Sequence, residues 1–379
     1  MNNKYKYDIT YAFGHGRKEK LFSKENHGKE FFYGYPYFEN RGYKLNIIET
    51  SEESSSKHFK KLFLILDNFF AKFTKLTFYM NVLISKKTLS EIYNSKNIVT
   101  SNHGIGMSFF VFIFFMKKFR KLNFVVILSG LFAMKKSKLI VRILRKLVFS
   151  FFLITVDKLV FTNRSEFNFA INNFEKFSAK FICLPFCLDE NFWKNNKEPD
   201  FNKEKKEILF IGNNGHRDFD LVVKIANELK DLPFTFITNR IKDEDIKSEN
   251  VKNIAGDWNL GYLSDFEIKE YYEKSRLVIL PINNTLVSSG QSAGLQAASV
   301  GTPVMTTKTI GFWDYDNYEH DENIIFVNNN DLDIWVSEIK EIYNNVNKLE
   351  LLSKNGLSLI RNKYKLSNFD LELERHLIL

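Results

Sequence analysis

A glycine-led turn followed by a short helix of small residues constrains the fold of this chain more than any other segment. Residues 288–311 have the sequence SSGQSAGLQAASVGTPVMTTKTIG. Gly290 and Gly294 allow backbone to approach a ligand closely, and the free N–H groups at the start of the helix, aided by its dipole, favour an anion. Gly301 and Pro303 predict the end of the helix, and the β-branched residues that follow predict a buried strand. The segment therefore predicts an anion site beside the start of a helix.

A second junction of strand and helix precedes it in the chain. Residues 207–212, EILFIG, form a compact apolar strand that turns into a polar loop containing Asn213 and Arg217, and an amphipathic helix follows. A guanidinium presents a planar fork of donors that suits phosphate oxygens. Arg217 is therefore a candidate anion ligand. The alternative is a residue at the start of a helix that pairs with Asp218 or Asp220.

The rest of the chain continues this alternation of strands and helices. Further strands are predicted at residues 6–13, 44–48, 97–100, 157–162, 234–238, 277–281 and 304–307. Strands and helices in this order, with short loops, predict an α/β fold with doubly wound parallel sheets. At 379 residues and 44% apolar content, the chain is long enough for two cores of ordinary size.

The segment at 288–304 resembles the nucleotide-sugar site of retaining glycosyltransferases of family 4, which have the GT-B fold. In that family a glutamate, seven residues and a second glutamate precede a small-residue helix and Gly-(Thr or Lys)-Pro-Val. Gly-Thr-Pro-Val is present at residues 301–304, so Ser288 and Gln296 stand where the glutamates would be. Gln296 can still bond a ribose hydroxyl, whereas Ser288 is too short to replace a carboxylate. Taken alone, the segment is also compatible with an ordinary βαβ connection.

The resemblance implies two Rossmann-like domains that face a cleft, with the donor bound by the second domain. Arg217 matches the basic residue that contacts the donor diphosphate in the family, and residues 262–264 match a region beside the nucleobase. Ser264 is more simply explained as a helix N-cap, with Glu267 completing a capping box. The donor-binding residues predicted in this way are Gly212, Asn213, Arg217, Asn239, Tyr262, Leu263, Ser288, Ser289, Gly290, Gln291, Ser292 and Gln296.

Two loops in the N-terminal half follow predicted strands and contain histidine. They are GHGR at 14–17 and SNHGIG at 101–106. Open α/β sheets bind ligands at the carboxyl ends of their strands, which makes His15 and His103 candidate catalytic residues, although either could be a loop histidine bonded to backbone. The resemblance places these loops, with Gly14, Gly16 and Gly104, on the acceptor side of the cleft. Closure of the domains would bring His103 or His15 toward the acceptor hydroxyl.

The resemblance also implies a stereochemical course. A family-4 enzyme retains the anomeric configuration and strictly needs no protein base. The absence of both glutamates leaves an inverting enzyme open, with His15 as its base, because inverting GT-B enzymes often keep a base in the loop after the first strand.

Domain boundaries follow from the resemblance and from the predicted strands. The family's hinge, a strand ending in proline and aspartate before an aromatic residue, is similar to residues 180–193. We therefore expect an N-terminal domain at 1–186, a C-terminal domain at 187–365, and a helix at 366–379 that crosses back onto the first domain.

Charge is distributed unevenly between the two halves. Residues 1–190 contain 31 Lys and Arg against 15 Asp and Glu, and the remainder contains 23 against 30. Residues 92–156 contain no acid, and the basic residues there alternate with Phe, Leu and Ile. Such a segment is attracted to an anionic membrane surface. The run at 105–116 is too short to span a bilayer and is expected in the core, whereas 139–154 predicts either an interfacial helix or a buried helix with one basic edge.

Other partner and compartment classes have weaker support. The sequence has a pI near 9.1 but no helix-turn-helix, zinc-finger or RNA-recognition signature, so nucleic acid is not expected as a partner. Cys183 and Cys187 are the only cysteines, and no histidine cluster or secretory signal accompanies them. We expect a reduced, cytoplasmic protein with no bound metal and no cofactor, peripheral at the inner face of the membrane.

The sequence therefore predicts a metal-independent glycosyltransferase, similar to hexosyltransferases of polysaccharide biosynthesis. Its expected partners are a nucleotide-sugar donor and a saccharide or lipid-linked acceptor. Two alternatives stay open: a protein that binds a nucleotide sugar without turnover, because Ser288 and Gln296 replace acids, and a scaffold at the membrane surface, because residues 92–156 lack acids.

Overall fold

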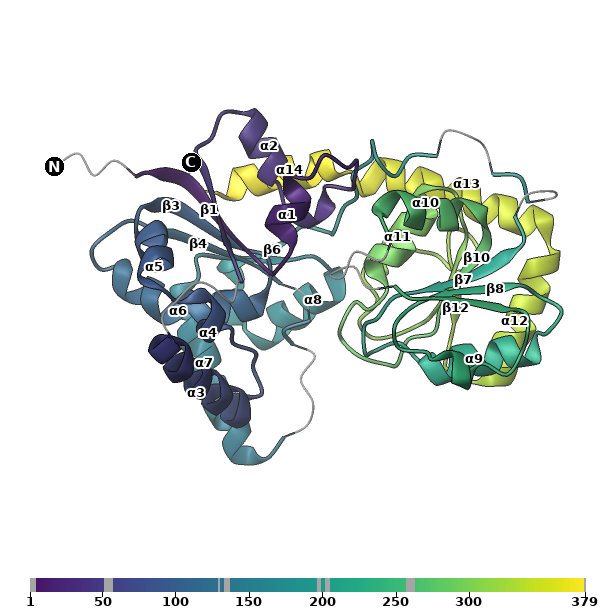
Figure 1. Cartoon of the computed structure of the whole chain (residues 1–379), viewed down its shortest axis with the longest axis horizontal. Helices are drawn as coiled ribbons and strands as arrows, with labels where there is room; N and C mark the ends of the chain where they lie inside the picture. The colour runs from purple at the N-terminus through teal and green to yellow at the C-terminus, as the bar shows by residue number, and fades with distance from the viewer. Residues whose placement is uncertain are drawn as a thin grey trace.

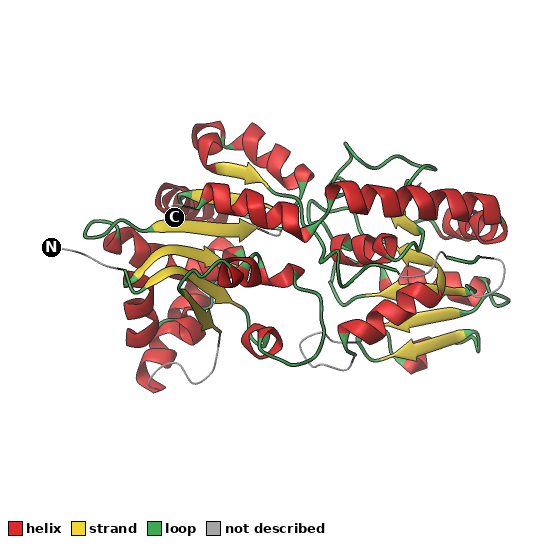
Figure 2. Ribbon diagram, turned by 90° about the horizontal axis from the view of Figure 1, so that it is seen from above, coloured by secondary structure: helices red, strands yellow, loops and turns green. Residues whose placement is uncertain are grey.

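The chain folds into two lobes, each built on a parallel sheet with helices packed around it (Figure 1). The computed structural model describes residues 5–50, 57–128, 130–132, 137–195, 199–201, 205–256 and 263–377. Seen from above, the two sheets lie side by side along the long axis of the molecule (Figure 2). The predicted α/β class with two Rossmann-like domains is confirmed.

The N-terminal sheet has six strands in the order β2-β1-β3-β4-β5-β6, all parallel. They are β1 (Tyr7–Phe13), β2 (Leu45–Glu49), β3 (Ser95–Thr100), β4 (Asn123–Leu128), β5 (Lys158–Phe161) and β6 (Phe181–Cys183). The helices of this lobe are α1 (Arg17–Leu21), η1 (Glu30–Phe32), α2 (Tyr35–Asn40), α3 (Lys57–Thr74), α4 (Met80–Leu83), α5 (Lys86–Tyr93), α6 (His103–Met116), α7 (Leu139–Thr155), α8 (Arg164–Asn173) and η2 (Glu175–Lys180).

The C-terminal sheet also has six parallel strands, in the order β12-β11-β10-β7-β8-β9. They are β7 (Glu207–Ile211), β8 (Phe234–Ile237), β9 (Val251–Ile254), β10 (Ser275–Leu280), β11 (Val304–Thr307) and β12 (Ile325–Val327). The helices are α9 (Phe219–Glu228), η3 (Asp243–Asp245), α10 (Asp265–Lys274), α11 (Gln291–Ser299), α12 (Leu332–Asn344), α13 (Val346–Lys363) and α14 (Leu366–His376).

The order of each sheet reverses at one place, and such a switch point is where open α/β sheets bind ligands. In the N-terminal sheet it lies between β1 and β3, and in the C-terminal sheet between β7 and β10. Every residue of β4 and β10 is buried, as expected for parallel strands covered on both faces. The two histidine loops and the two predicted anion loops therefore follow the strands that flank these two switch points.

Local signals predicted the glycine-led segment closely. Gly290 has a φ of 84° and caps α11, which ends at Ser299, and Gly301 follows in a left-handed conformation with a φ of 81°. The predicted strand at 304–307 is β11, and Ser264 forms the predicted capping box with Glu267. Three strands, β4, β9 and β12, were not predicted.

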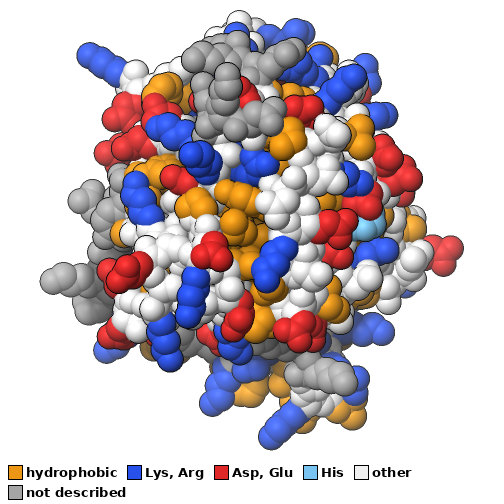
Figure 3. Space-filling model, turned by 90° about the vertical axis from the view of Figure 1, so that its right-hand side faces the viewer, with side chains coloured by type: hydrophobic (Ala, Val, Ile, Leu, Met, Phe, Trp, Pro, Cys, Tyr) orange, Lys and Arg blue, Asp and Glu red, His pale blue; other side chains and the backbone are white. Residues whose placement is uncertain are grey.

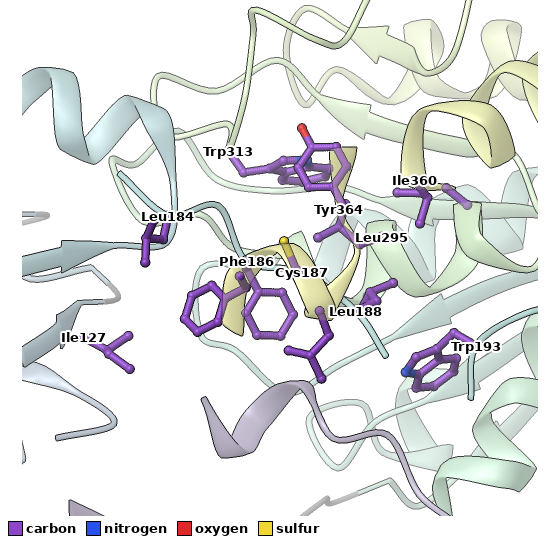
Figure 4. Close-up of a cluster of buried hydrophobic side chains, with 14 of the residues drawn as sticks. Ile127, Leu184, Phe186, Cys187, Leu188, Trp193, Leu295, Trp313, Ile360 and Tyr364 are labelled. Atoms are coloured by element: carbon purple, nitrogen blue, oxygen red, sulfur yellow. The ribbon is translucent and has the colours of Figure 1, made fainter. Parts of the chain in front are cut away.

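One apolar cluster joins the two lobes (Figure 4). It includes Ile127 from β4, the crossover segment at 184–193 that follows β6, and Leu295 and Trp313 from the C-terminal lobe. Figure 4 shows Phe186, Cys187 and Leu188 of the crossover segment between the lobes. Polar contacts add to it, because the Arg164 N–H donates to the Trp313 carbonyl at 2.8 Å. The lobes are therefore held in contact by packing as well as by hydrogen bonds.

The chain crosses between the lobes twice, and the two crossings lie together. Leu188 of the crossover segment forms a parallel bridge with Lys365, just before α14. Helix α14 then lies beside α2 of the N-terminal lobe (Figure 1), where the Glu374 carboxylate accepts from the Tyr37 hydroxyl at 2.7 Å and pairs with Arg41. The last helix thus contacts the first lobe, along the segment expected at 366–379.

The acid-free segment forms helices with different surroundings. Helix α6 buries most of its first turns, including Ile105, Phe109 and Ile113, in agreement with a core helix. Helix α7 buries only its last part, around Phe149 and Phe152, and exposes apolar residues before them. Within the described ranges, no helix combines the length and apolarity needed to cross a bilayer.

Replacing Gly301 with Ala is expected to destabilise the fold more than the same change at Gly42. Both residues have a positive φ, which costs an alanine about 1–2 kcal/mol. At Gly301 a Cβ would also lie 2.6 Å from the Pro199 ring, whereas nothing lies within 4 Å at Gly42. Overpacking adds about 1–3 kcal/mol. Urea unfolding of both variants measures the difference, and equal losses would contradict the packing around Gly301.

Candidate functional site

A cavity of about 300 Å³ opens at the switch point of the C-terminal sheet. Its walls come from the ends of β7 and β8, from α10 and α11, from the opposite lobe through Phe31, and from the crossover segment through Trp193. The lining side chains are mostly apolar, with a few polar groups between them, as is usual for small-molecule sites. The residues are Phe31, Trp193, Ile211, Gly212, Asn213, Arg217, Ile237, Gly256, Leu263, Asp265, Ile268, Tyr272, Ser292, Ala293 and Gln296.

Arg217 is held in this cavity by the glycine that ends strand β7. Gly212 has a φ of 126°, and a Cβ on it would lie 2.6 Å from the Arg217 Nε. The Arg217 N–H donates to the Asn214 carbonyl at 3.0 Å, which closes the loop. Only glycine at 212 lets the guanidinium lie against the backbone, so the sequence of the loop itself fixes the position of the charge.

The Arg217 guanidinium is a buried charge with no acidic neighbour among the described residues. Its side chain is 6% exposed, and its Nε and Nη1 have no hydrogen-bond partner in the described part of the chain. Burial lowers the pKa of Arg217 to about 10, so the group stays charged at neutral pH. A buried, unpaired cation is costly unless an anion completes it. The site is therefore built for a negatively charged ligand.

Arg217 does not form an ion pair with the neighbouring Asp218. The Asp218 carboxylate accepts from the Leu221 N–H at 3.1 Å and from the Asn330 side chain at 2.9 Å. It caps α9, and none of the ion pairs found in the described ranges joins it to Arg217. The anion-ligand prediction for Arg217 is thus the one that its surroundings favour.

The start of α11 faces the same guanidinium. A Cβ on Gly290 would lie 3.7 Å from the Arg217 Nη1, and no side chain caps the helix. The hydroxyl of Ser289 is buried without a hydrogen-bond partner in the described residues. The first N–H groups of the helix and the guanidinium are donors that lie close together, which suits a phosphate group.

Five predicted donor residues are not among the residues that line the cavity: Asn239, Ser288, Ser289, Gly290 and Gln291. Ser288 donates through Oγ to the Gly311 carbonyl at 2.9 Å. Gln291 donates to the Thr162 carbonyl of the opposite lobe at 2.9 Å. Asn239 is exposed, and its Oδ1 accepts from the Gly256 N–H at 2.9 Å. Their contacts with a donor stay predictions, and Tyr262 lies outside the described residues.

Asn213 and Leu263, two of the predicted donor-binding residues, both line the cavity, and their side chains do different things there. The Asn213 Oδ1 accepts from the Thr238 hydroxyl at 2.8 Å and from the Asn239 N–H at 2.7 Å, and its Nδ2 donates to the Gly256 carbonyl. Its amide therefore ties together the loops after β7, β8 and β9. Leu263 adds apolar surface next to Ile268.

Gln296 lies where the cavity meets the N-terminal lobe. Its Nε2 donates to the Glu30 Oε1 at 3.2 Å, and its Oε1 accepts from the Tyr272 hydroxyl at 3.4 Å. Glu30 is 2% exposed and also accepts from the Trp193 Nε1 at 2.8 Å, and burial raises the pKa of Glu30 to about 7. The polar wall of the cavity thus contains an acid from the other lobe.

Asp265 is a second acid that the sequence did not single out as a site residue. It lines the cavity at the start of α10 and accepts from the Lys20 Nζ at 2.7 Å and the Gly28 N–H at 3.1 Å. Trp193, Tyr272 and Glu30 were also missed. Lys20 belongs to α1 and Glu30 to η1 of the other lobe, and no local sequence pattern links them to α10 or α11.

The two histidine loops differ in their surroundings. His15 is exposed on the turn between Gly14 and Gly16, after β1, and is not among the residues lining either cavity described here. His103 begins α6, whose N-cap is Asn102, and lines a second cavity of about 1140 Å³.

The second cavity lies in the N-terminal lobe, next to the loop of the C-terminal lobe that contains Val287. It combines four basic side chains, Lys72, Lys75, Lys138 and Arg145, with apolar ones such as Ile140. Gly130 lines it and touches the opposite lobe, since a Cβ there would lie 3.1 Å from Val287, next to the turn at Gly290. Gly104 packs close to the Tyr79 ring beside His103. Gly130 therefore places one edge of this cavity against the C-terminal lobe near the turn at Gly290.

The described residues contain no group of three or more His, Cys, Asp or Glu side chains placed to hold a metal ion.

Replacing Arg217 with Met is expected to leave the ligand-free protein within about 1 kcal/mol of the parent, or to stabilise it, because the change removes an uncompensated buried charge. Arg276 is the matched control. It is also buried, but it donates to the carbonyls of Tyr343, Phe201 and Lys205, so Arg276→Met should cost about 3 kcal/mol or more. Denaturant unfolding compares them. A large loss for Arg217→Met would show that the guanidinium serves stability.

Known proteins were compared with the chain. No protein-family model and no curated protein matches it. Among solved structures, sucrose-phosphate synthase from Thermosynechococcus elongatus superposes with a TM-score of 0.67 at 12% identity, over 97% of this chain and 98% of that one. A glycosyltransferase from Rickettsia africae gives 0.66 at 11% identity, over 98% of both chains.

Anabaena HepE in complex with UDP gives a TM-score of 0.63 at 9% identity, over 97% of this chain and 98% of that one. These are full-length similarities of fold at low sequence identity. Together with the two facing parallel sheets, they show that the chain has the GT-B fold.

Proposed function

We propose that this protein is a glycosyltransferase that takes the sugar of a nucleotide-sugar donor and transfers it to an acceptor bound by the N-terminal lobe. The observation that carries the proposal is the buried Arg217 guanidinium, unpaired in the described residues and facing the uncapped start of α11. A fold alone does not fix a function, so the site has to carry the argument. Its position at the switch point, facing a second lobe, supports a donor diphosphate there.

The lining of the cavity supports an orientation for the donor. The apolar side chains of Ile211, Ile237 and Ile268 offer a surface for a nucleobase, and Gln296 and Tyr272 offer polar groups for the ribose. Arg217 and the start of α11 would then hold the diphosphate, with the sugar beyond it, toward the N-terminal lobe. HepE has been solved with UDP and with UDP-glucose, which supports a uridine nucleotide as the first donor to test.

Transfer of the sugar leaves negative charge on the departing diphosphate. The guanidinium of Arg217 and the N–H groups at the start of α11 are donors already in place for that charge, and preorganised donors of this kind lower the barrier to reaction. Because these groups can perform the task that a divalent ion performs in other transferases, we propose metal-independent transfer. The motif at 301–304 supports retention, and no observation on the exposed His15 favours inversion.

The second cavity supports the class of acceptor. Its basic and apolar side chains suit an anionic molecule with an apolar part, such as a lipid-linked saccharide used in the synthesis of a cell-surface glycan. His103 lines this cavity, which Gly130 connects to the loop that contains Val287. We therefore propose His103 as the residue that contacts the acceptor hydroxyl.

An exposed apolar and basic face supports docking on a membrane. Helices α3 and α7 pack together, and Ile140 and Leu147 of α7 are 68% and 63% exposed. Basic residues such as Arg142 and Lys146 lie among them. In Figure 3 acidic and basic side chains mix on the end of the C-terminal lobe, whereas hydrophobic and basic ones meet on the projection at the bottom, at the level of the lower ends of α3 and α7. We propose that this face contacts the anionic cytoplasmic leaflet.

Binding of nucleoside diphosphates tests the donor site. Arg217→Met should weaken UDP binding roughly 10- to 100-fold, because hydrogen bonds to a charged group contribute about 1.5–3 kcal/mol. Arg361→Met removes an exposed cation from α13 and serves as the control, with no expected change. Calorimetric titration measures affinity, after a thermal-shift panel of uridine, guanosine, adenosine and cytidine diphosphates. Equal affinity of Arg217→Met and parent would remove Arg217 from the diphosphate site.

Hydrolysis of nucleotide sugars then distinguishes an enzyme from a binding protein. The parent should release nucleoside diphosphate slowly in the absence of acceptor, and nuclear magnetic resonance of the released sugar reports its anomeric configuration. Binding without any turnover, with or without lipid-linked acceptors, would instead identify a non-catalytic nucleotide-sugar protein.

Vesicle binding tests the membrane face. The variant Ile143→Glu/Leu147→Glu should sediment with phosphatidylglycerol vesicles at least about tenfold less than the parent, because two apolar contacts are replaced by charges that the lipid repels. The control, Ile334→Glu/Leu351→Glu, alters exposed apolar residues of the C-terminal lobe and should bind like the parent. If both double variants bind equally well, the face on α3 and α7 is not the contact.

A further inference from the structure

Glu30 is an acid of the N-terminal lobe that reaches the wall of the donor cavity. It begins η1, and its Oε1 accepts from the Trp193 Nε1 at 2.8 Å and from the Gln296 Nε2 at 3.2 Å. The bond to Gln296 joins residues 266 positions apart and is a direct polar contact between the lobes at this cavity. The Glu30 Oε2 is buried without a hydrogen-bond partner among the described residues. The carboxylate therefore has capacity that the fold does not use.

The hydrogen bond to Glu30 decides which end of the Gln296 amide faces the cavity. An amide has a donor end and an acceptor end, whereas a carboxylate at the same position offers two acceptor oxygens. When a ribose hydroxyl acts as donor, the Gln296 amide can accept from it only through its oxygen, so that oxygen has to face the cavity. With the Nε2 bonded to Glu30, the Oε1 is the end that receives the Tyr272 hydroxyl at 3.4 Å.

We propose that Glu30 is a positioning residue for donor recognition. By accepting from the Gln296 Nε2, it keeps the Gln296 oxygen available to a ribose hydroxyl of the bound nucleotide. The inference rests on the proposed function and adds to it that recognition of the ribose requires contact between the two lobes. Glu30 and Gln296 together do what a single glutamate on α11 could do alone.

The protonation of Glu30 leaves this arrangement in place. Burial raises the pKa of Glu30 to about 7, the nearby Asp265 adds to the rise, and bonds from its own backbone N–H, Gln296 and Trp193 oppose it. Arg17 and Lys20 are the cations that face this acidic pair. Because the Trp193 N–H donates to the same Oε1 as Gln296, a proton on Glu30 belongs on Oε2, and Oε1 stays an acceptor.

Deoxynucleotides give the direct test. Affinities for UDP and for its 2′-deoxy and 3′-deoxy forms are measured on the folded full-length chain and on two variants, Glu30→Leu and Glu30→Gln. The parent should prefer UDP by about tenfold over at least one deoxy form, the effect of one hydrogen bond. Glu30→Leu removes the acceptor for the Gln296 Nε2, so it should lose that preference.

Glu30→Gln provides the rescue. The Trp193 N–H holds its amide oxygen at the place of the Glu30 Oε1, so residue 30 still accepts from the Gln296 Nε2 and the preference should match that of the parent. Unchanged preference in Glu30→Leu, or equal loss in Glu30→Leu and Glu30→Gln, overturns the role of Glu30 while UDP binding by the parent leaves the donor site standing. A parent that binds no nucleoside diphosphate overturns both.

Discussion

The rest of the site depends on the buried guanidinium of Arg217, which has no acidic partner among the residues that the structure describes. Proteins rarely bury a cation without a partner, because desolvation costs several kcal/mol. Here the backbone at Gly212 and the phenyl ring of Phe210 surround it, and burial lowers its pKa without removing the charge at neutral pH. The cost is explained if the missing partner is a ligand.

Residues of both lobes line the cavity that contains Arg217. The apolar cluster around the crossover segment brings the N-terminal lobe against the face of the C-terminal sheet where Arg217 lies. Contacts such as Lys20 to Asp265 and Glu30 to Gln296 then complete the polar wall of the cavity from the other side. The site is thus shared between the lobes, and the affinity for a ligand there should depend on their relative position.

Sequence alone predicted the parts of this arrangement that depend on local chemistry. Gly290, Gly301 and Pro303 mark the turn and the end of α11, because glycine adopts a positive φ readily and proline cannot continue a helix. The edge strands β9 and β12 are short, and β4 lies in an apolar segment where periodicity does not separate strand from helix, so these were missed. Glu30 could not be predicted, since its contact with Gln296 exists only after both lobes have folded.

The most direct measurement is a crystal structure of the chain soaked with UDP. The diphosphate should lie within hydrogen-bond distance of the Arg217 guanidinium and the first N–H groups of α11, with the ribose at Gln296. A diphosphate bound elsewhere, or an Arg217 side chain paired with a protein carboxylate in a cavity closed to ligands, would contradict this placement.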